Sequence, residues 1–359
     1  MAHRVLFGIY HWGLGHATRS LVLIRALLAR GDAVTIVMQD GPGLSLLRSE
    51  LGSRCEYFPF HDTPAPLGRS PALFYLKMSL SVPWILAGFR AEHRLTERLV
   101  RERRFDRVVS DSRIGIWSAE VPSFFIFHSL HQIVPGRSRF LERKVEWGQR
   151  MLLKGFAKVL IPDVEEDGGL SGYLGHEPAY DWGEGRLVYL GPLSDVARPG
   201  LPEDIDYFFS VSGLGTPQKD FGELVLDALP HIKGRAVVTL GRPEAAGQTR
   251  TVAGATVYGY LDRKLQAEML NRARVVVARS GYTTLMELAE LGKRALFVPT
   301  PGQSEQEYLA RYHRHRGHVW STAQRALDLP RDIARAETAR GIPRISPAQS
   351  VERFLSVVG

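Results

Sequence analysis

Cysteine is nearly absent from this sequence, because Cys55 is the single example among 359 residues. A chain with one cysteine has no partner for an intrachain disulfide and too few thiolates for a cysteine-based metal cluster. The small secreted folds that depend on several disulfides are therefore excluded. The chain is instead long enough to form two domains, each with a hydrophobic core of its own.

Long uninterrupted apolar runs are also lacking. The most apolar segment, 72–89, contains Lys77 and Pro83, and its length barely reaches that of a bilayer crossing. We therefore expect a pair of core helices here rather than a membrane-spanning helix. The alternative is an interfacial membrane patch that combines aromatic and basic side chains, namely Phe74, Trp84, Phe89, Arg90, Arg94 and Arg98.

The start of the chain, MAHRVLFGIY, holds only a short apolar run before the polar His11. This pattern predicts a first strand rather than a signal peptide, so we expect a cytoplasmic protein. Basic residues outnumber acidic ones by 46 to 38, which gives a net charge of +8. The excess favours anionic partners such as nucleotide diphosphates or lipid headgroups. No basic block with interleaved aromatic residues stands out, so nucleic acid is not expected as a partner.

The most informative stretch of the chain is 274–311. A buried-strand run, Val275 to Ala278, precedes a tight turn, and a helix is predicted from about Tyr282 to Leu291. Gly292 suits the left-handed position just past the end of that helix. A second strand, Ala295 to Val298, then leads through prolines and a glycine into a helix that starts near residue 304.

This stretch carries polar groups where a nucleotide sugar would need them. The start of the first helix has unpaired N–H groups beside the hydroxyls of Ser280, Thr283 and Thr284, and such an end attracts phosphate. Glu287, one turn further on, could accept hydrogen bonds from two sugar hydroxyls. Polar groups suited to a hexose follow in the second loop and helix: Gln303, Glu305, Gln306 and Glu307. The alternative is a helix-capping turn followed by a solvated acidic helix start.

The residues RSGYTTLMELAELG, followed by VPTPGQSEQEY, resemble the donor-binding region of family 28 glycosyltransferases. The best-known member of that family is the peptidoglycan N-acetylglucosaminyltransferase. Its pattern runs roughly RSGALTxxExxxxG…VPxxxxxxQQYxNA and aligns here without gaps. A composite motif of this kind is much more specific than a lone glycine pattern. The matching positions are Arg279, Ser280, Gly281, Thr284, Glu287, Gly292, Pro299, Gln306 and Tyr308.

The resemblance implies a role for each part of the motif. Ser280, Gly281 and Thr284 would lie at the diphosphate, with Arg279 beside them. Glu287 would hold the ribose, while Gln306 and Glu307 would hold the donor sugar. Glu307 replaces the second glutamine of the family pattern and Ala310 replaces the asparagine, so the donor sugar need not be N-acetylglucosamine.

The N-terminal segment predicts a strand, a glycine loop and a helix. Val5 to Tyr10 reads as the strand, and the helix extends from about Ala17 to Arg30. The intervening loop contains Gly13, Gly15 and His16, but Thr18 replaces the third glycine of the dinucleotide-binding fingerprint. Family 28 enzymes carry a Gly-His loop here, in the interdomain cleft near the sugar acceptor and the donor phosphates. By this resemblance His16 could be the general base. The alternative is a histidine that caps the helix.

Two further polar side chains follow predicted strands. Arg107 to Ser110 would deliver Asp111, and Val121 to Phe127 would deliver His128, at the strand ends where α/β sheets bind ligands. Asp111 rivals His16 as the base, and His128 is a candidate on the acceptor side of the site. Each of them could instead be a cap or turn residue.

Glycine, proline and acidic residues concentrate before the second half of the chain. We expect an acceptor-binding domain at 1–190, a linker at 191–206, a nucleotide-sugar domain at 207–345, and a helix at 346–359 that can cross back to the first domain. Asp204 and Asp206 match the Asp-x-Asp of metal-dependent transferases, but we interpret them as turn residues. By resemblance, a loop with Ser212, Gly213 and Gly215 faces the donor diphosphate, and the loop with Tyr260 and Leu261 meets the nucleotide base.

These observations together predict an α/β protein of the GT-B type, with two Rossmann-like domains whose parallel sheets face a central cleft. The predicted activity transfers a hexose from a nucleoside diphosphate sugar, expected to be UDP-linked, to a hydroxyl acceptor, and the family resemblance implies inversion. Helix N-termini would stabilise the departing diphosphate, so no metal cofactor is expected. A nucleotide-sugar hydrolase and a non-catalytic nucleotide-sugar binding protein are the two alternatives.

Overall fold

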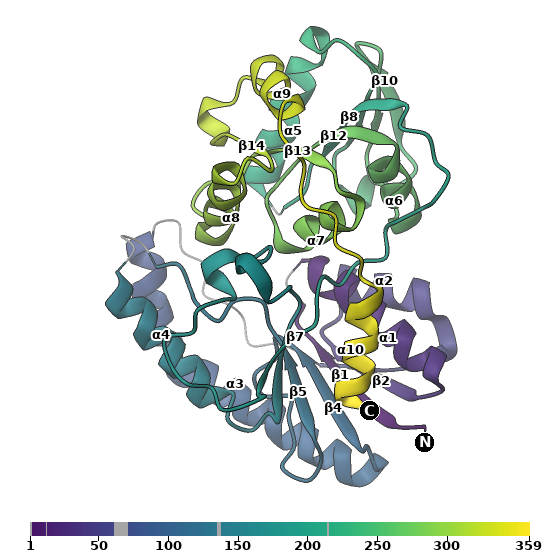
Figure 1. Cartoon of the computed structure of the whole chain (residues 1–359). Helices are drawn as coiled ribbons and strands as arrows, with labels where there is room; N and C mark the ends of the chain where they lie inside the picture. The colour runs from purple at the N-terminus through teal and green to yellow at the C-terminus, as the bar shows by residue number, and fades with distance from the viewer. Residues whose placement is uncertain (1, 12, 61–70, 135–137, 214) are drawn as a thin grey trace. The chain divides into compact units, whose positions relative to one another are not determined.

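The computed structural model describes residues 2–11, 13–60, 71–134, 138–213 and 215–359. It divides into two compact units (Figure 1). Unit 1 comprises Met1–Leu193 and Ala348–Gly359, and unit 2 comprises Ser194–Pro347. Residues 194–204, predicted as linker, pack within unit 2, where the Ser194 hydroxyl donates to Glu290 over 2.6 Å.

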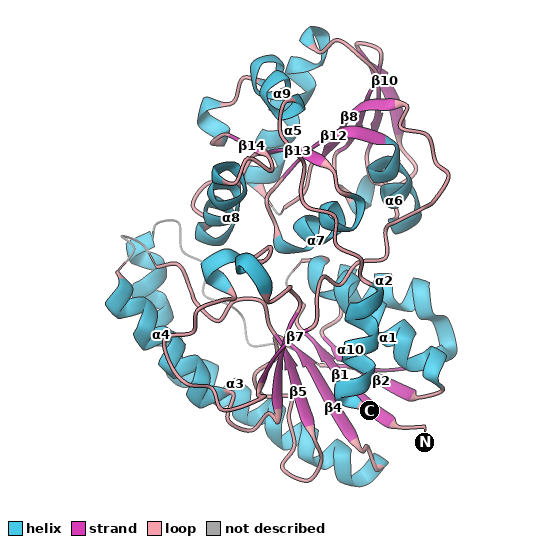
Figure 2. Ribbon diagram, viewed as in Figure 1, coloured by secondary structure: helices cyan, strands magenta, loops and turns pink. Residues whose placement is uncertain are grey.

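Unit 1 contains a seven-stranded sheet in which every neighbouring pair of strands is parallel (Figure 2). The strand order is β3-β2-β1-β4-β5-β6-β7. The strands are β1 (Arg4–Ile9), β2 (Ala33–Met38), β3 (Glu56–Pro59), β4 (Arg107–Asp111), β5 (Ser123–Ile126), β6 (Lys158–Ile161) and β7 (Leu187–Tyr189). The α-helices are α1 (Gly15–Arg30), α2 (Pro42–Leu51), α3 (Pro71–Arg103), α4 (Arg139–Leu152) and α10 (Ala348–Val358).

Apolar strand runs and helix-ending glycines explain these elements. Val5, Leu6, Phe7 and Ile9 of β1 are completely buried, as expected for a strand covered on both faces. Gly31 ends α1 in the left-handed conformation, with φ of 96°. The C-terminal helix α10 packs beside α1 within unit 1 (Figure 1).

The apolar segment 72–89 does not form the expected pair of core helices. It belongs to the single long helix α3, which runs through Pro83 without a break. None of residues 81–90 is buried, and the Trp84 side chain is 75% exposed. Carbonyl groups that lose their partner at an exposed proline can be hydrated, so the helix tolerates it here. Among the residues that the structure describes, no helix combines the length and apolar character that a bilayer crossing needs.

Unit 2 repeats the same plan with one antiparallel edge. Its sheet order is β10-β11-β9-β8-β12-β13-β14, and only the β10–β11 pair is antiparallel. The strands are β8 (Ile205–Ser210), β9 (Ala236–Thr239), β10 (Thr249–Val252), β11 (Ala255–Tyr258), β12 (Ala273–Ala278), β13 (Arg294–Phe297) and β14 (Trp320–Ser321). The α-helices are α5 (Thr216–Ala228), α6 (Arg263–Arg272), α7 (Tyr282–Leu291), α8 (Ser304–His315) and α9 (Leu329–Glu337).

Both sheets reverse their winding direction at one point. In unit 1 the order reverses between β1 and β4, and in unit 2 it reverses between β8 and β12. Ligands of doubly wound sheets bind outside the carboxyl ends of the strands at such a switch point. The residues that follow these four strands are therefore the expected positions of ligand-binding and catalytic groups. The predicted α/β class, with two Rossmann-like sheets, is confirmed.

Candidate functional site

A buried network of charges occupies the switch point of unit 1. Gly13 lies in the left-handed region with φ of 75°, and α1 begins two residues later at Gly15. His16 therefore lies in the first turn of α1, while Asp111 is the last residue of β4. The His16 Nδ1 atom lies 2.9 Å from Asp111 Oδ1. The two predicted catalytic residues are thus in direct contact.

Arg19 completes this network, although sequence reasoning missed it. Its Nε donates to Asp111 Oδ2 over 2.7 Å, and its Nη2 contacts Asp111 Oδ1. The Ser20 hydroxyl donates to the same Oδ2 over 2.8 Å. A histidine and an arginine three residues apart lie on the same side of a helix. That spacing was the only sequence signal, since the partner carboxylate lies in a distant part of the chain.

The electrostatics distinguish the two candidate bases. Burial alone would raise the pKa of Asp111, but the charges of Arg19 and His16 hold that pKa well below its usual range. Burial and the charge of Arg19 lower the pKa of His16, against the raising effect of Asp111. His16 is therefore neutral near pH 7, and its side chain keeps 20% exposure. A neutral, partly exposed imidazole is suited to accept a proton.

Two sequence interpretations need correction at this point. Asp111 is completely buried and accepts hydrogen bonds from four neighbours, so it is placed to orient the imidazole and has no exposed surface from which to act as the base. His16 does not cap α1, because the cap position is Leu14 and no side chain hydrogen-bonds there. His128 lies two residues past β5, and its Nδ1 is 3.3 Å from Arg19 Nη1, so it joins the same network.

The switch point of unit 2 joins two loops. Ala278 of β12 is paired with Ser210 of β8, so the loop after each strand starts at the same edge of the sheet. In the first loop Ser212 is exposed, and Gly213 and Gly215 have φ values of 119° and 66° that favour glycine. In the second loop Gly281 precedes α7, and a Cβ added there would meet no atom within 4 Å.

Arg279 and Ser280 have structural partners in this loop. Arg279 is 2% exposed and donates from Nη1 to the Val298 and Pro299 carbonyls, over 2.9 and 3.1 Å. Its Nη2 donates to the Pro217 carbonyl and to Gln324 Oε1, both over 2.7 Å. The Ser280 hydroxyl is completely buried and donates to the Gln306 carbonyl over 2.8 Å. We therefore correct both assignments: these side chains fix the loop, and a phosphate there would meet backbone N–H groups and the partly exposed Thr284.

The polar residues after β13 shape the loop that precedes α8. Gln306 Oε1 accepts a hydrogen bond from the Thr300 N–H over 2.8 Å, and Glu307 Oε1 accepts one from the Gly302 N–H over 3.1 Å. Gln303 is exposed at the N-cap of α8. The amide nitrogen of Gln306, the second carboxylate oxygen of Glu307 and the exposed side chain of Gln303 have no hydrogen-bond partner in the described chain and could contact a sugar.

Glu287 differs from these residues because no described group hydrogen-bonds its carboxylate. It lies on α7, and burial raises its pKa to about 7, with Arg263 opposing and Glu290 adding to that rise. Tyr260 is half-buried and Leu261 is buried in the loop before α6, so that loop can present only its backbone and the Tyr260 ring.

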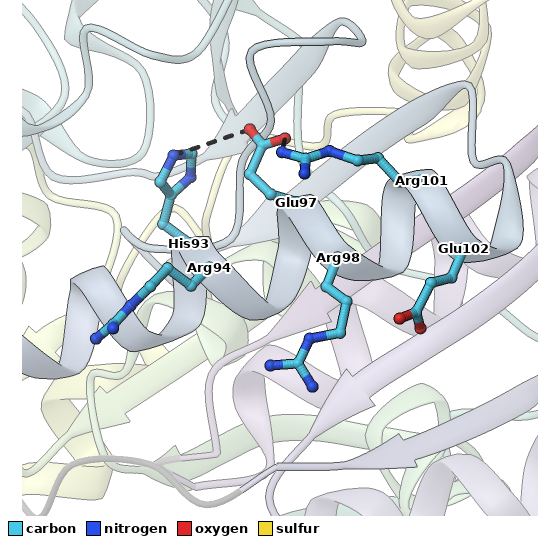
Figure 3. Close-up of a pocket in the computed structure, with 6 residues that line it drawn as sticks. All are labelled: His93, Arg94, Glu97, Arg98, Arg101 and Glu102. Atoms are coloured by element: carbon cyan, nitrogen blue, oxygen red, sulfur yellow. Dashed lines mark ion pairs between the residues drawn. The ribbon is translucent and has the colours of Figure 1, made fainter.

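Other candidate features lie away from these switch points. A surface hollow of about 490 Å³ follows α3 and is lined by arginines and glutamates of that one helix, with Glu97 between His93 and Arg101 (Figure 3). Asp204 accepts hydrogen bonds from Arg235 and Arg272, and Asp206 accepts one from Arg274. The Asp-x-Asp pair therefore forms ion pairs at the start of β8, which corrects its interpretation as a turn.

Comparison with known proteins matches one part of the sequence to a family model and the whole fold to solved structures. Residues 211–338 match the model of the glycosyltransferase family 28 C-terminal domain. The glycotransferase of kitacinnamycin is 17% identical, with a TM-score of 0.64 over 99% of this chain and 94% of that one. The calicheamicin glycosyltransferase CalG4 is 15% identical, with the same TM-score over 100% and 96%. MurG of Acinetobacter baumannii is 12% identical, with a TM-score of 0.58 over 99% of each chain.

These solved structures share the fold across almost the whole length of the chain, although their sequences have diverged widely. A comparison with curated proteins found no significant match. The matched C-terminal domain contains both loops of the unit 2 switch point. The chain therefore has the GT-B fold of glycosyltransferases, and its residues 211–338 match the C-terminal domain of glycosyltransferase family 28.

Proposed function

We propose that the protein transfers a hexose from a UDP-sugar to a hydroxyl acceptor, with inversion and without a metal cofactor. The observation that carries this proposal is the unit 2 switch point, where a glycine loop and the start of α7 meet beside an unpartnered carboxylate, Glu287. A diphosphate, a ribose and a sugar would contact these groups in that order along the chain. The family 28 match of residues 211–338 supports the same arrangement.

The donor diphosphate would lie at the N-terminus of α7. Gly281 has an ordinary φ of −71° and open space around its Cα, so nothing within the chain requires a glycine there. Close approach of a phosphate to the backbone explains the choice of residue. The unpaired N–H groups and the helix dipole would then stabilise the negative charge that develops as the diphosphate departs.

The acceptor would be activated in unit 1. The lone pair of the acceptor hydroxyl attacks the anomeric carbon, the bond from that carbon to the diphosphate oxygen breaks, and the hydroxyl proton passes to His16 Nε2. Asp111 holds the imidazole through Nδ1, which leaves Nε2 as the proton-accepting atom. We assign His128 to the acceptor side as well, and its contact with Arg19, which joins it to the His16 network, supports this assignment.

One experiment separates the three candidate activities. The purified protein is incubated with a panel of UDP-sugars, each with and without a mixture of hydroxyl acceptors, and UDP and free sugar are quantified. Acceptor-dependent release of UDP supports the transferase, and release of free sugar without an acceptor indicates a hydrolase. Binding without any release of UDP indicates a sensor. Unchanged turnover in EDTA supports a mechanism without metal, whereas loss that Mg²⁺ or Mn²⁺ restores contradicts it.

Glu287 gives a pH-dependent prediction for donor binding. Two ribose hydroxyls that donate to the carboxylate would lower its pKa from about 7, so binding would release a proton. The affinity for an intact UDP-hexose should therefore be nearly constant above pH 8 and fall by up to about tenfold between pH 8 and pH 6. Calorimetry with the intact nucleotide sugar is suitable, because its diester phosphates do not titrate in this range.

The matched variant is Glu287→Gln, which keeps the shape but cannot titrate. Its affinity should be lower by about 1.5–3 kcal/mol at pH 8 and independent of pH. A wild-type affinity that does not change between pH 6 and pH 8 would contradict the ribose assignment.

We also propose that unit 1 contacts an anionic membrane surface, at the cytoplasmic face. Helix α4 is inverted: it buries Glu142 and Glu146 completely and exposes Phe140 by 68% and Trp147 by 51%. Its exposed apolar face also includes Leu141, Val145 and Leu152. Exposed cationic side chains on the same helix, Arg139, Arg143 and Lys144, match anionic headgroups. Trp84 of α3 adds an aromatic group, while the side chain of Phe74 lies outside the described residues.

Vesicle binding tests this contact. The protein should cosediment with vesicles that contain phosphatidylglycerol more strongly than with pure phosphatidylcholine vesicles. Phe140→Ser and Trp147→Ser should each weaken that binding by about tenfold, since each removes one apolar anchor. Leu224→Ser, at an exposed leucine of unit 2, is the control and should change nothing. Equal binding of all variants would rule out α4 as the membrane contact.

A further inference from the structure

We propose that Arg19 is a positioning residue for sugar transfer, which fixes Asp111 and His16 so that His16 presents an unprotonated Nε2 to the acceptor hydroxyl. The inference rests on the proposed role of His16 as the base. It adds a third member to the pair that the sequence pointed to. Arg19 is 2% exposed, so this guanidinium belongs to the interior of unit 1 and not to its surface.

The guanidinium contacts four polar members of the network: Asp111, Ser112, His16 and His128. Its Nε and Nη2 grip the two oxygens of Asp111, and its Nη2 also donates to Ser112 Oγ over 3.2 Å. The same Nη2 lies 3.0 Å from His16 Nδ1, and Nη1 lies 3.3 Å from His128 Nδ1. A two-oxygen grip of this kind needs the planar fork of arginine, which lysine lacks.

Donor and acceptor chemistry then fixes the imidazole tautomer. An ionised carboxylate can only accept hydrogen bonds, so His16 Nδ1 bonds to Asp111 Oδ1 only when Nδ1 carries the hydrogen. Arg19 Nη2 lies 3.0 Å from the same Nδ1, and in that tautomer it is an electrostatic neighbour of the ring and not a hydrogen-bond donor to it. Arg19 Nη2 and the Ser112 hydroxyl are further donors to Oδ1, while Arg19 Nε and the Ser20 hydroxyl donate to Oδ2. The carboxylate is thereby held in one orientation, and the lone pair of His16 lies on Nε2.

The positive charge of Arg19 also opposes the effect of the Asp111 carboxylate on the pKa of His16. Asp111 on its own would raise the pKa of His16 and favour an imidazolium that cannot accept a proton. Burial, the charge of Arg19 and the proximity of His128 act in the opposite direction. Another buried charged pair of unit 1 is Arg113 with Glu92, joined by a hydrogen bond of 2.8 Å, and neither residue is among the groups that shift the pKa of His16. Arg19 is thus the main cation that keeps the imidazole neutral.

The backbone conformation of Ser112 is further evidence that the residues around Asp111 are held in a functional arrangement. It follows Asp111 directly and has φ of 62°, in the left-handed region that serine rarely adopts. Such conformations persist where surrounding contacts enforce them, and they concentrate at functional sites. Here the Ser112 N–H donates to the Ile126 carbonyl over 3.2 Å, and its hydroxyl receives Arg19 Nη2. The strained turn therefore aims the end of β4 at Arg19.

The test compares Arg19→Met and Arg19→Lys with Arg25→Met, which changes a partly exposed arginine on the same helix. The readout is the pH profile of kcat/KM between pH 5 and pH 9, together with a histidine-selective NMR titration of the His16 Cε1–H signal. In Arg19→Met the acid limb of the profile and the His16 signal should both move to higher pH, by about one pH unit or more. Arg25→Met should match the wild type.

Arg19→Lys keeps the positive charge but loses the planar guanidinium that donates to both oxygens of Asp111. Its acid limb should stay near the wild-type position, while kcat falls at every pH because the carboxylate is no longer held at both oxygens. If Arg19→Met does not fold, the kcat of Arg19→Lys tests the proposal by itself. Wild-type kcat in the lysine variant, or an acid limb and His16 signal that do not move in a folded methionine variant, would overturn the proposal. If His16→Ala itself retains full turnover, the base assignment fails instead, so the two failures are distinguishable.

Discussion

His16→Ala is expected to lower kcat by about 100- to 10,000-fold, the range that a positioned general base contributes. The expected loss follows from the site, because the His16 Nε2 atom is the only basic position that the Asp111 contact leaves available on this ring. UDP affinity should change little, since most groups assigned to the nucleotide lie on unit 2 and the substitution leaves Gly13 and Gly15 of the unit 1 loop in place. Steady-state kinetics and calorimetry with UDP measure the two effects separately.

The pH profile of the wild type adds a second criterion. Because the pKa of His16 is lowered from 6.5, kcat/KM should rise with pH through a value below 6.5 and be constant near neutrality. His93→Ala is the control, since that histidine stacks on Trp117 in unit 1 and does not contact the Asp111 network. Turnover that survives in His16→Ala would assign the base to another group.

Asp111→Asn should reduce kcat as well, but for a different reason. The amide keeps the shape of the carboxylate, yet it removes the charge that Arg19 pairs with and weakens the hold on His16 Nδ1. An uncompensated buried arginine costs about 3–5 kcal/mol of stability, so this variant should also unfold more easily. His16→Ala leaves that ion pair intact, and it should lose activity without a comparable loss of stability.

Local patterns alone predicted several elements of unit 2. Tyr282 and Leu291 were expected as the bounds of a helix, and α7 has these bounds, because Gly281 precedes it and Gly292 ends it with φ of 69°. The buried apolar run from Val275 to Ala278 similarly indicated β12. Signals of this kind depend on neighbours within a few residues, so they can be interpreted without knowing the fold.

What the sequence could not predict depends on partners far away in the chain. Arg19 looks like a surface arginine of an amphipathic helix until Asp111, 92 residues later, is placed beside it. The inversion of α4 was likewise hidden, because a strongly amphipathic pattern does not say which face meets the core. Glu146 is buried because the N–H groups of Ala179 and Tyr180 donate to it, over 3.1 and 3.2 Å.

Arg279→Ala is the second change with a large expected effect, and it concerns stability first. The side chain donates four hydrogen bonds to oxygens of three separate segments and stacks over Phe221 at 4.4 Å. Hydrogen bonds from a charged group are worth about 1.5–3 kcal/mol each, and the partners left behind are buried. We expect unit 2 to lose about 3 kcal/mol or more, which corresponds to about 6–12 °C in Tm.

Donor affinity should fall because unit 2 becomes less stable, and not because a direct contact between Arg279 and the donor is lost. Arg279 ties the start of α5, through Pro217, to the loop that follows β13, and both segments border the proposed diphosphate site. Arg279→Lys should be intermediate, because one ammonium cannot reach all four oxygens. Arg250→Ala, at an exposed arginine of β10, is the control for a lost charge. A folded Arg279→Ala protein with wild-type Tm and abolished UDP binding would show that Arg279 is a direct ligand of the donor. The loss of Tm and the loss of UDP affinity, measured on the same variant, therefore decide whether Arg279 supports the loop by packing or contacts the substrate.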